Sequence, residues 1–288
     1  MNLEFIRGVG ATNWLYRTLI RQIAKRVLRR GISIRLPTGL RMKIPMRSPH
    51  GTEVFITRAN TDWGAEALFC RFADADRDFC DIGSNIGYYS LYLSPCVRKI
   101  FAFEPDSRNF TGLRENLAAA DNIEHIPLAI SNRSGIVHLD VSHDAAVSRI
   151  REGPSAGSVA VEAVTLDQFL LHRPDARVSL IKIDIEGHDV AALEGARQTV
   201  AHHQPLILIE FGQGDPAAEF NNPARLISFC DVVGYSVFAY THIKPGRYQD
   251  RLVQLASTDF STTKLKMLFL VPEHLLNSFK QIVTHQDG

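Results

Sequence analysis

Two short apolar segments that each end in an acidic residue constrain the fold of this chain most. The first covers residues 79–87 (FCDIGSNIG) and passes into a glycine turn, and the second covers residues 101–105 (FAFEP). Asp81 and Glu104 are 23 positions apart, which is the length of one strand–turn–helix–strand unit. In such a unit the first turn lets a ligand approach the backbone, and the second strand delivers a carboxylate to a ribose diol. The sequence therefore predicts a nucleoside pocket.

The glycine spacing indicates which nucleoside. A dinucleotide site needs G-x-G-x-x-G, because a pyrophosphate must approach bare backbone at a helix N-terminus. Here the pattern is D-x-G-x-x-x-G, with Asn85 where a second close-approach glycine would stand, and Asp81 would repel phosphate. S-adenosylmethionine, which lacks phosphates and carries positive charge, suits the turn better. An NAD-dependent oxidoreductase, a non-catalytic module that binds S-adenosylmethionine, and a turn that only closes a packing contact are the alternatives.

Residues near the carboxyl ends of the expected strands are the candidate cofactor ligands. Glu104 should accept hydrogen bonds from the ribose hydroxyls, and Asp81 should organise the turn and reach the amino end of the methionine moiety. Asp106 and Asn109 could flank the adenine or ribose, or only cap the following helix. The expected cofactor-binding residues are Asp81, Gly83, Ser84, Asn85, Gly87, Glu104, Pro105, Asp106, Asn109, Ala129 and Asp184.

A second signal lies in residues 180–189 (LIKIDIEGHD), where an apolar strand leads to an acid before a helix start. Asp184 is expected near the sulfonium and the nucleophile, where it could stabilise the cation, orient a hydroxyl, or hold a divalent metal with Glu186 and Glu210. No histidine completes a convincing ligand set, so no metal site is predicted. His188 is the best general-base candidate by position, although a histidine at a helix start is often only surface. The expected catalytic residues are Asp184, Glu186 and His188.

Alternating strand and helix patterns from residue 77 onward predict an α/β fold. Seven strands are expected in a mostly parallel sheet with helices on both faces, and the last, at 266–271, is expected to insert antiparallel at the sheet edge. Residues 31–58 read as short strands and turns, with a hairpin at 32–44. The division predicted is a basic helix-and-hairpin extension over residues 1–58 and a catalytic domain over 59–288, with a strand-rich insert at 135–165. The strands are expected at 78–82, 99–103, 123–130, 180–185, 205–211, 235–240 and 266–271.

Charge is unevenly distributed along the chain. The net charge of +1 gives no argument for nucleic acid, but residues 1–47 carry eleven basic residues against one acid, Glu4. A helix expected over residues 13–30 has an apolar face and a basic face. It could pack on the body and offer its basic face to solvent, or it could associate peripherally with an anionic membrane or a phosphorylated substrate.

The location expected is the cytoplasm. The four cysteines form no CxxC pair and read as free thiols of a reducing compartment. No apolar run approaches the roughly 18 residues of a membrane span.

Several motifs, in order and spacing, resemble the FkbM family of S-adenosylmethionine-dependent methyltransferases. They are DIGSNIG at 81–87, FEPD at 103–106, NL at 116–117, VTLDQF at 164–169, IKIDIEGH at 181–188 and LIE at 208–210. The resemblance covers roughly residues 50–272. It implies a class I, Rossmann-like methyltransferase fold and O-methylation of a hydroxyl on a sugar, glycolipid precursor or secondary metabolite. Family members often carry Glu where this chain has Asp189, which leaves the role of that acid open.

Overall fold

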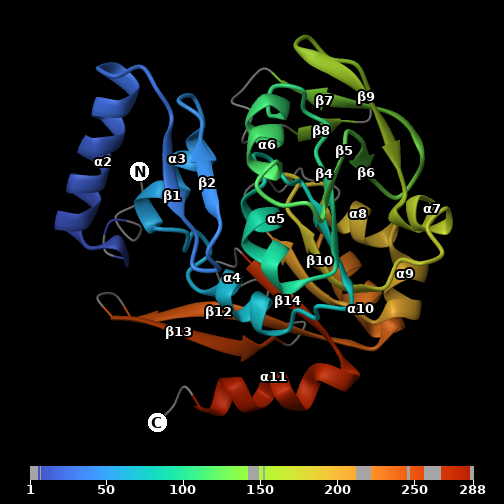
Figure 1. The fold of residues 1–288 in the computed structure, drawn as a ribbon. Helices are drawn as coiled ribbons and strands as arrows, with labels where there is room; N and C mark the ends of the chain where they lie inside the picture. The colour runs from blue at the N-terminus through green and yellow to red at the C-terminus, as the bar shows by residue number, and fades with distance from the viewer. Residues whose placement is uncertain are drawn as a thin grey trace.

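The protein is described from a computed structural model that covers residue 6 and residues 8–141, 149–151, 153–211, 222–244, 247–255 and 267–285. Figure 1 shows a central twisted sheet with helices on both sides and the N-terminal segment along one edge. The N-terminal elements are α2 (Ala11–Arg26), β1 (Ile32–Arg35), β2 (Arg41–Ile44), α3 (Pro49–Thr57) and α4 (Ala65–Arg71).

The remaining elements build the sheet and its covering helices. They are β3 (Asp78–Ile82), α5 (Tyr88–Leu93), η1 (Ser94–Cys96), β4 (Lys99–Phe103), α6 (Phe110–Leu117), β5 (Ile123–Ile126), β6 (Ala129–Ile130), β7 (Gly135–Asp140), β8 (Arg149–Arg151), β9 (Ser158–Val164), α7 (Leu166–Leu171), β10 (Val178–Ile183), α8 (Asp189–Glu194), α9 (Arg197–His203), β11 (Leu206–Glu210), α10 (Pro223–Val233), β12 (Tyr235–Lys244), β13 (Arg247–Gln254), β14 (Met267–Pro272) and α11 (Glu273–His285).

The main sheet of the described residues has eight strands in the order β13-β12-β14-β11-β10-β3-β4-β5. Strands β11, β10, β3, β4 and β5 run parallel, and β14 pairs antiparallel with both β11 and β12. The mostly parallel α/β fold is confirmed, and a strand lies at each of the seven predicted places. The eighth strand, β13, was not predicted, because its sequence RYQDRLVQ is largely polar.

The predicted place of the last strand is wrong. Strand β14 lies between β11 and β12 instead of at the sheet edge. Its six residues, MLFLVP, are all buried, so it has two covered faces and two hydrogen-bonded neighbours. The edge beside β12 is occupied by β13.

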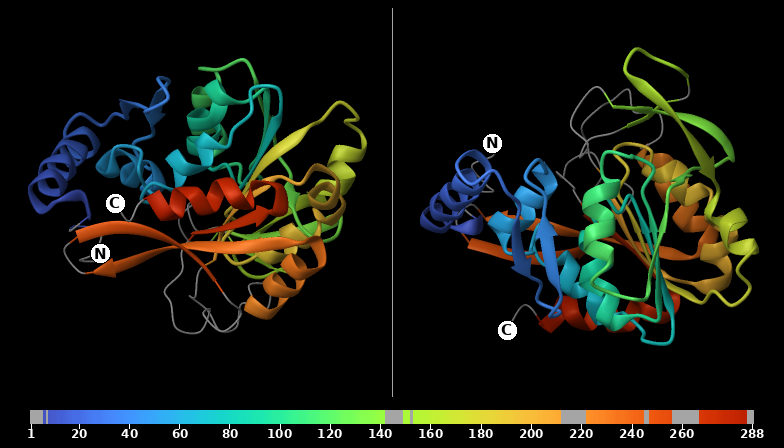
Figure 2. Two further views of the ribbon diagram at one scale, coloured as in Figure 1. Left: turned by 90° about the horizontal axis from the view of Figure 1, so that it is seen from below. Right: turned by 45° about the horizontal axis from the view of Figure 1, so that its top comes forward.

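Successive side chains of the strands point to opposite faces of the sheet and belong to two separate hydrophobic clusters. One cluster joins Phe79, Leu180 and Phe269 of the sheet to buried side chains of α3, α4, α5, α6 and α11. The other joins residues such as Ile82 and Ile183 to α7, α8, α9 and α10. The sheet is therefore the middle layer of three, as the two views of Figure 2 show from other directions.

The N-terminal segment packs into the first of these clusters. The predicted hairpin is confirmed, with Ile32 opposite Ile44 and Arg35 opposite Arg41. Residues 49–57, read as strand and turn in the sequence, form the helix α3 instead. Ser48 caps this helix by accepting the Gly51 N–H, and Pro49 stands in its first turn, where a proline loses no hydrogen bond.

The insert at 135–165 is strand-rich as predicted, and its small sheet has the order β6-β9-β7-β8. The strand expected at 123–130 is split in two. Residues 123–126 pair with β4 in the main sheet, whereas Ala129 and Ile130 leave it and pair with β9. Pro127 at the break has no N–H to continue the ladder. The split brings the insert to the carboxyl edge of the main sheet.

Two further findings concern membranes and thiols. In the part of the chain that is described, no helix combines the length and the apolar character needed to span a bilayer. Cys70, Cys80, Cys96 and Cys230 are free thiols. The fold nevertheless brings the sulfur atoms of Cys70 and Cys96 to 3.1 Å from each other, which their spacing in the sequence does not reveal.

Candidate active site

A cavity of about 450 Å³ opens at the carboxyl ends of β3, β4, β10 and β11. This is the edge at which open α/β sheets bind ligands, and the volume is that of a small-molecule site. Helix α3 and the small sheet close its sides. Its lining includes nine of the predicted site residues, Asp81, Gly83, Ser84, Asn85, Glu104, Pro105, Ala129, Asp184 and Glu186.

The turn after β3 is held tightly against the end of β10. Gly83 has φ of +81°, and a Cβ atom built on it would lie 2.0 Å from the backbone oxygen of Asp184. The N–H groups of Gly83 and Ser84 both donate to the Phe103 carbonyl, at 3.0 and 2.9 Å. Glycine at position 83 is therefore required by the contact between two strand ends, whether or not a ligand is bound.

Glu104 is oriented by the backbone of two loops. Its Oε2 accepts the Asn85 N–H at 2.8 Å, and its Oε1 accepts the Asp106 N–H at 2.8 Å. Burial raises the pKa of Glu104 to about 7, and these two backbone hydrogen bonds oppose that rise. A carboxylate offers about four lone-pair sites, so both oxygens can still accept bonds from a ribose diol.

The bottom of the pocket holds polar atoms that lack partners. Asp81 is fully buried and its Oδ2 accepts the Ser90 hydroxyl at 2.6 Å. Within the described residues, neither Asp81 Oδ1 nor Ser84 Oγ has a hydrogen-bond partner. Burial raises the pKa of Asp81, and the Lys182 charge opposes this. Buried acceptors of this kind suit a ligand that brings N–H donors.

Lys182 supplies the positive charge at the centre of the site. Its Nζ lies 3.0 Å from Asp184 Oδ2 and 4.9 Å from the ring centre of Tyr89, and the side chain is only 4% exposed. Burial alone would lower the pKa of Lys182, but the Asp184 and Asp81 carboxylates raise it above its ordinary value. Lys182 therefore stays protonated at neutral pH and cannot act as a general base.

The loop after β10 presents Glu186 on a constrained turn. Glu186 has φ of +52° and is followed by Gly187 at +94°. The Asp189 carboxylate fixes this turn by accepting the Ile185 N–H at 2.9 Å and the Gly187 N–H at 3.0 Å. Asp189 is 1% exposed and does not line the pocket. Its role, left open by the sequence, is to shape the loop that carries Glu186.

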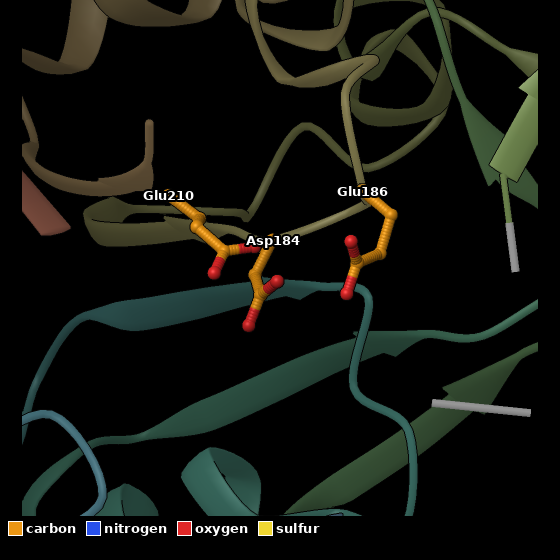
Figure 3. A group of neighbouring side chains, drawn as sticks. All are labelled: Asp184, Glu186 and Glu210. Carbon is orange, nitrogen blue, oxygen red and sulfur yellow. The ribbon is translucent and has the colours of Figure 1, made fainter. Parts of the chain in front are cut away.

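Three carboxylates converge at the mouth of the pocket. Figure 3 shows Asp184, Glu186 and Glu210 directed toward one another, and one oxygen of each lies within 4.8 Å of the others. Burial, together with the Asp184 charge and a hydrogen bond between the two side chains, raises the pKa of Glu210 well above its usual value. Such a group of oxygen ligands could hold a divalent cation, which the sequence offered as one option for these three residues without predicting a metal site.

The N-terminal half of the molecule adds residues that the sequence did not assign to the pocket. His50 and Glu53 reach it from α3, and Asp62 reaches it from the loop before α4. Asp62 accepts the Tyr89 hydroxyl at 2.7 Å, and Tyr88 donates to Glu66 at 3.0 Å. The only sequence signal for these residues was the cap-and-proline start of α3.

Four predicted site residues, Gly87, Asp106, Asn109 and His188, do not line the pocket. Gly87 stands at the start of α5, where an added Cβ would lie 3.1 Å from Leu113 and Leu117, so its smallness serves helix packing. Asp106 is 3% exposed, pairs with Arg108 at 2.7 Å and donates its backbone N–H to Glu104. Asn109 lines a separate hollow between the β1–β2 hairpin and α6.

His188 does not occupy the position of a general base. It is 5% exposed, its Nε2 lies 2.9 Å from Ser131 Oγ, and it starts α8 on the far side of the strand end. Burial, aided by the Arg225 and Arg133 charges, lowers the pKa of His188 to about 4. Because His188 does not line the pocket, it cannot reach the proton of a hydroxyl bound there.

Comparison with known proteins gives one family and one curated relative. The model of the methyltransferase FkbM domain matches residues 81–237. The hexuronic acid methyltransferase AglP of Haloferax volcanii is 30% identical over 130 residues, which are 44% of this chain and 53% of AglP. The chain thus covers about half the length of this relative.

Solved structures give more distant likenesses. The methyltransferase FkbM of Methylobacillus flagellatus KT shares 14% identity at a TM-score of 0.43, over 76% of this chain and 52% of that one. The precorrin-6y C5,15-methyltransferase of Geobacter metallireducens GS-15 shares 12% identity at a TM-score of 0.42, over 72% of this chain and 87% of that one. At such low identities and TM-scores, the substrates of these two proteins say nothing about the substrate of this chain. The family match covers more than half of the sequence, and the chain is therefore a methyltransferase of the FkbM family.

Proposed function

We propose that this protein transfers the methyl group of S-adenosylmethionine to a hydroxyl of a sugar, glycolipid precursor or secondary metabolite. The observation that carries the proposal is Glu104, a buried carboxylate in a 450 Å³ cavity whose two oxygens are aimed by backbone N–H groups. This is the acceptor pair that a ribose diol requires.

The rest of the pocket fits the other parts of that cofactor. Asp81 Oδ1 and Ser84 Oγ await donors, as an amino group would provide. Leu128, Ala129 and Ile130 form an apolar wall for an adenine ring. The acids of the site favour a sulfonium and disfavour a pyrophosphate, which argues against the NAD-dependent alternative.

When bound, S-adenosylmethionine supplies an electrophilic methyl group on a sulfonium. The protein must then align a hydroxyl with that group and accept the hydroxyl proton. We assign the proton to Asp184, whose Oδ2 is held by Lys182 and whose side chain is 31% exposed at the mouth. Glu186, on the turn fixed by Asp189, would orient the acceptor.

The relative AglP is named for a hexuronic acid, which supports a sugar acceptor here. A uronic acid carries both hydroxyls and a carboxylate. The carboxylate would meet Asp184, Glu186 and other acids at the mouth, and like charges at close range repel. We therefore favour a sugar hydroxyl over the carboxylate as the methylated group.

The test is a transfer assay with isotope-labelled S-adenosylmethionine, run on neutral glycosides, uronic acid glycosides and phenolic metabolites with and without Mg²⁺. The expected product is a methyl ether that survives mild base. A base-labile methyl ester would overturn the assignment to a hydroxyl. Asp184→Asn should abolish most of the turnover with cofactor affinity retained, and His50→Gln serves as the comparison, because it changes another ionisable side chain of the pocket. An equal loss of cofactor affinity and turnover in Asp184→Asn would mean that Asp184 only holds the cofactor.

We propose the cytoplasm as the location, and a small molecule or glycan rather than nucleic acid as the partner. The four free thiols support a reducing compartment. Fractionation of cells that make the protein would test the location.

A further inference from the structure

Helix α2 is mounted with its apolar side outward. Leu15, Tyr16, Leu19, Ile23 and Val27, here called the outer face of α2, are between 42% and 71% exposed. At 100° per residue they form one continuous stripe along the helix. Figure 1 shows α2 as the outermost element on its side of the molecule, beyond α3 and the β1–β2 hairpin.

The side of α2 that packs on the body carries Arg17 and Arg21 beside the apolar residues Trp14, Ile20 and Ala24. Arg21 is fully buried, and it donates to Pro45 O at 2.6 Å, Met46 O at 3.2 Å and Thr52 Oγ1 at 3.1 Å. Arg17 donates to Ile56 O at 2.6 Å. These bonds to α3 and to the segment before it fix the rotation of α2 about its axis. Of the two arrangements that the sequence left open, the one observed differs from the first, in which the apolar side packs and the basic side meets solvent.

Burying Arg21 while exposing five large apolar side chains opposes the usual partition of residues between core and water. A contiguous apolar stripe on the surface marks a contact site. The charges beside it identify the partner. Arg26 lies within the exposed stripe, and Arg29 and Arg30 follow at the end of the helix, all exposed.

We propose that the outer face of α2 docks on an anionic lipid bilayer, lying in the interface with its apolar side chains in the acyl boundary. A short amphipathic helix with apolar and basic residues on the surface side has the composition of such interfacial helices. A parallel pairing of two outer faces would bring Arg26, Arg29 and Arg30 of both copies together, which disfavours it, and the light-scattering arm of the test covers an antiparallel pairing. The inference does not depend on the reaction proposed above.

The test is sedimentation of the full chain with vesicles of phosphatidylcholine alone and of phosphatidylcholine mixed with phosphatidylglycerol. Binding to the anionic vesicles, and its loss at high salt, is expected. The double change Leu19→Glu with Ile23→Glu should weaken binding at least about tenfold, since each change removes an apolar side chain that the bilayer would bury. Each of Arg26→Gln, Arg29→Gln and Arg30→Gln should weaken it about fivefold.

Matched controls lie on the far side of the molecule. Val232→Glu changes a side chain that is 67% exposed on α10, and Arg197→Gln removes an exposed charge on α9; both should leave vesicle binding unchanged. All the variants should bind S-adenosylmethionine as the parent does, which separates this test from that of the pocket. Failure of the parent to sediment with anionic vesicles overturns the proposal. So does a dimer in light scattering that Leu19→Glu dissociates, because the face would then serve a second copy.

Discussion

Lys182 Nζ lies 3.0 Å from Asp184 Oδ2, and through this contact a buried ammonium holds the acid at the mouth of the pocket in place. The Asp81 carboxylate also lowers the energy of the charged form of Lys182. The β3 and β10 strand ends, 101 residues apart between Asp81 and Lys182, are thereby joined by charge as well as by the sheet. The site is a network of three charges before any ligand enters.

Removing this ammonium should destabilise the protein. Lys182→Met leaves Asp81 and Asp184 without their cation, and breaking a buried pair in this way costs about 3 kcal/mol or more at pH 7. The loss should shrink at pH 5, because the acids can then take up protons. Urea unfolding at the two pH values measures it. The control is Lys99→Met, which breaks the exposed pair with Glu124 and should cost less than about 1 kcal/mol. Equal losses in the two variants would contradict the network.

Gly83 should tolerate no side chain. Gly83→Ala puts a Cβ 2.0 Å from the Asp184 carbonyl oxygen in addition to the positive φ. Gly39→Ala, at the tip of the β1–β2 hairpin, has a positive φ of 106° and nothing within 4 Å. The hairpin variant should lose about 1 kcal/mol from backbone strain alone. The pocket variant should lose about 1–3 kcal/mol more from overpacking. Similar melting temperatures for the two would show that the contact at the strand ends relaxes freely.

Asp189 should act on turnover through the shape of the Glu186 turn. Asp189→Ala leaves the Ile185 and Gly187 N–H groups unsatisfied, which should cost about 2 kcal/mol of stability. In addition, kcat should fall while the affinity for cofactor stays the same. Asp231→Ala, an exposed acid on α10, should change stability by less than about 0.5 kcal/mol. An unchanged kcat in a folded Asp189→Ala protein would separate Asp189 from the reaction.

The buried Glu104 predicts a pH dependence of stability in the protein without ligand. Burial raises its pKa from 4.5 to about 7 in the fold, so the folded state holds a proton that the unfolded chain releases. The stability contributed by that proton is full below about pH 4.5 and is lost as pH rises through 7. Relative to Glu104→Gln, the free energy of unfolding of the parent should fall by on the order of 3 kcal/mol as the pH rises from about 4.5 to about 7.

Thermal unfolding of both proteins from pH 4.5 to 8 measures the difference. Glu124→Gln is the control. Partial burial would raise the pKa of Glu124, but its bonds to Lys99 and Arg173 lower it overall, so its titration falls below this window. Parallel curves for the parent and Glu104→Gln would mean that Glu104 titrates at its ordinary pKa in the fold.

Local pattern was sufficient for much of the fold and for the centre of the site. Because the carboxyl ends of parallel strands meet at one edge of the sheet, the strands that end in acids predicted Asp81, Glu104 and Asp184 at that edge. The prediction from local pattern failed where contacts between residues far apart in the sequence decide the structure. The burial of β14 on both faces moved it inside the sheet, and the orientation of α2 is fixed by the Arg17 and Arg21 bonds to α3, which no periodicity reveals.

Long-range packing also explains which residues near the strand ends meet the pocket. His188 follows the strand end as closely as Glu186 does, but the Asp189 bonds turn the chain so that only Glu186 meets the pocket. His50 enters from a helix more than 30 residues before Asp81, and only the tertiary fold brings it there.

The central claim, that Glu104 grips the ribose of S-adenosylmethionine, is tested most directly by calorimetric titration of that compound into the parent protein and Glu104→Ala. We predict saturable binding to the parent and affinity lower by about 10- to 100-fold in the variant, the loss expected for hydrogen bonds to a charged group. NAD titrated in parallel should give no heat of binding. Equal affinity of the parent and the variant for S-adenosylmethionine, with both proteins folded, would contradict the account.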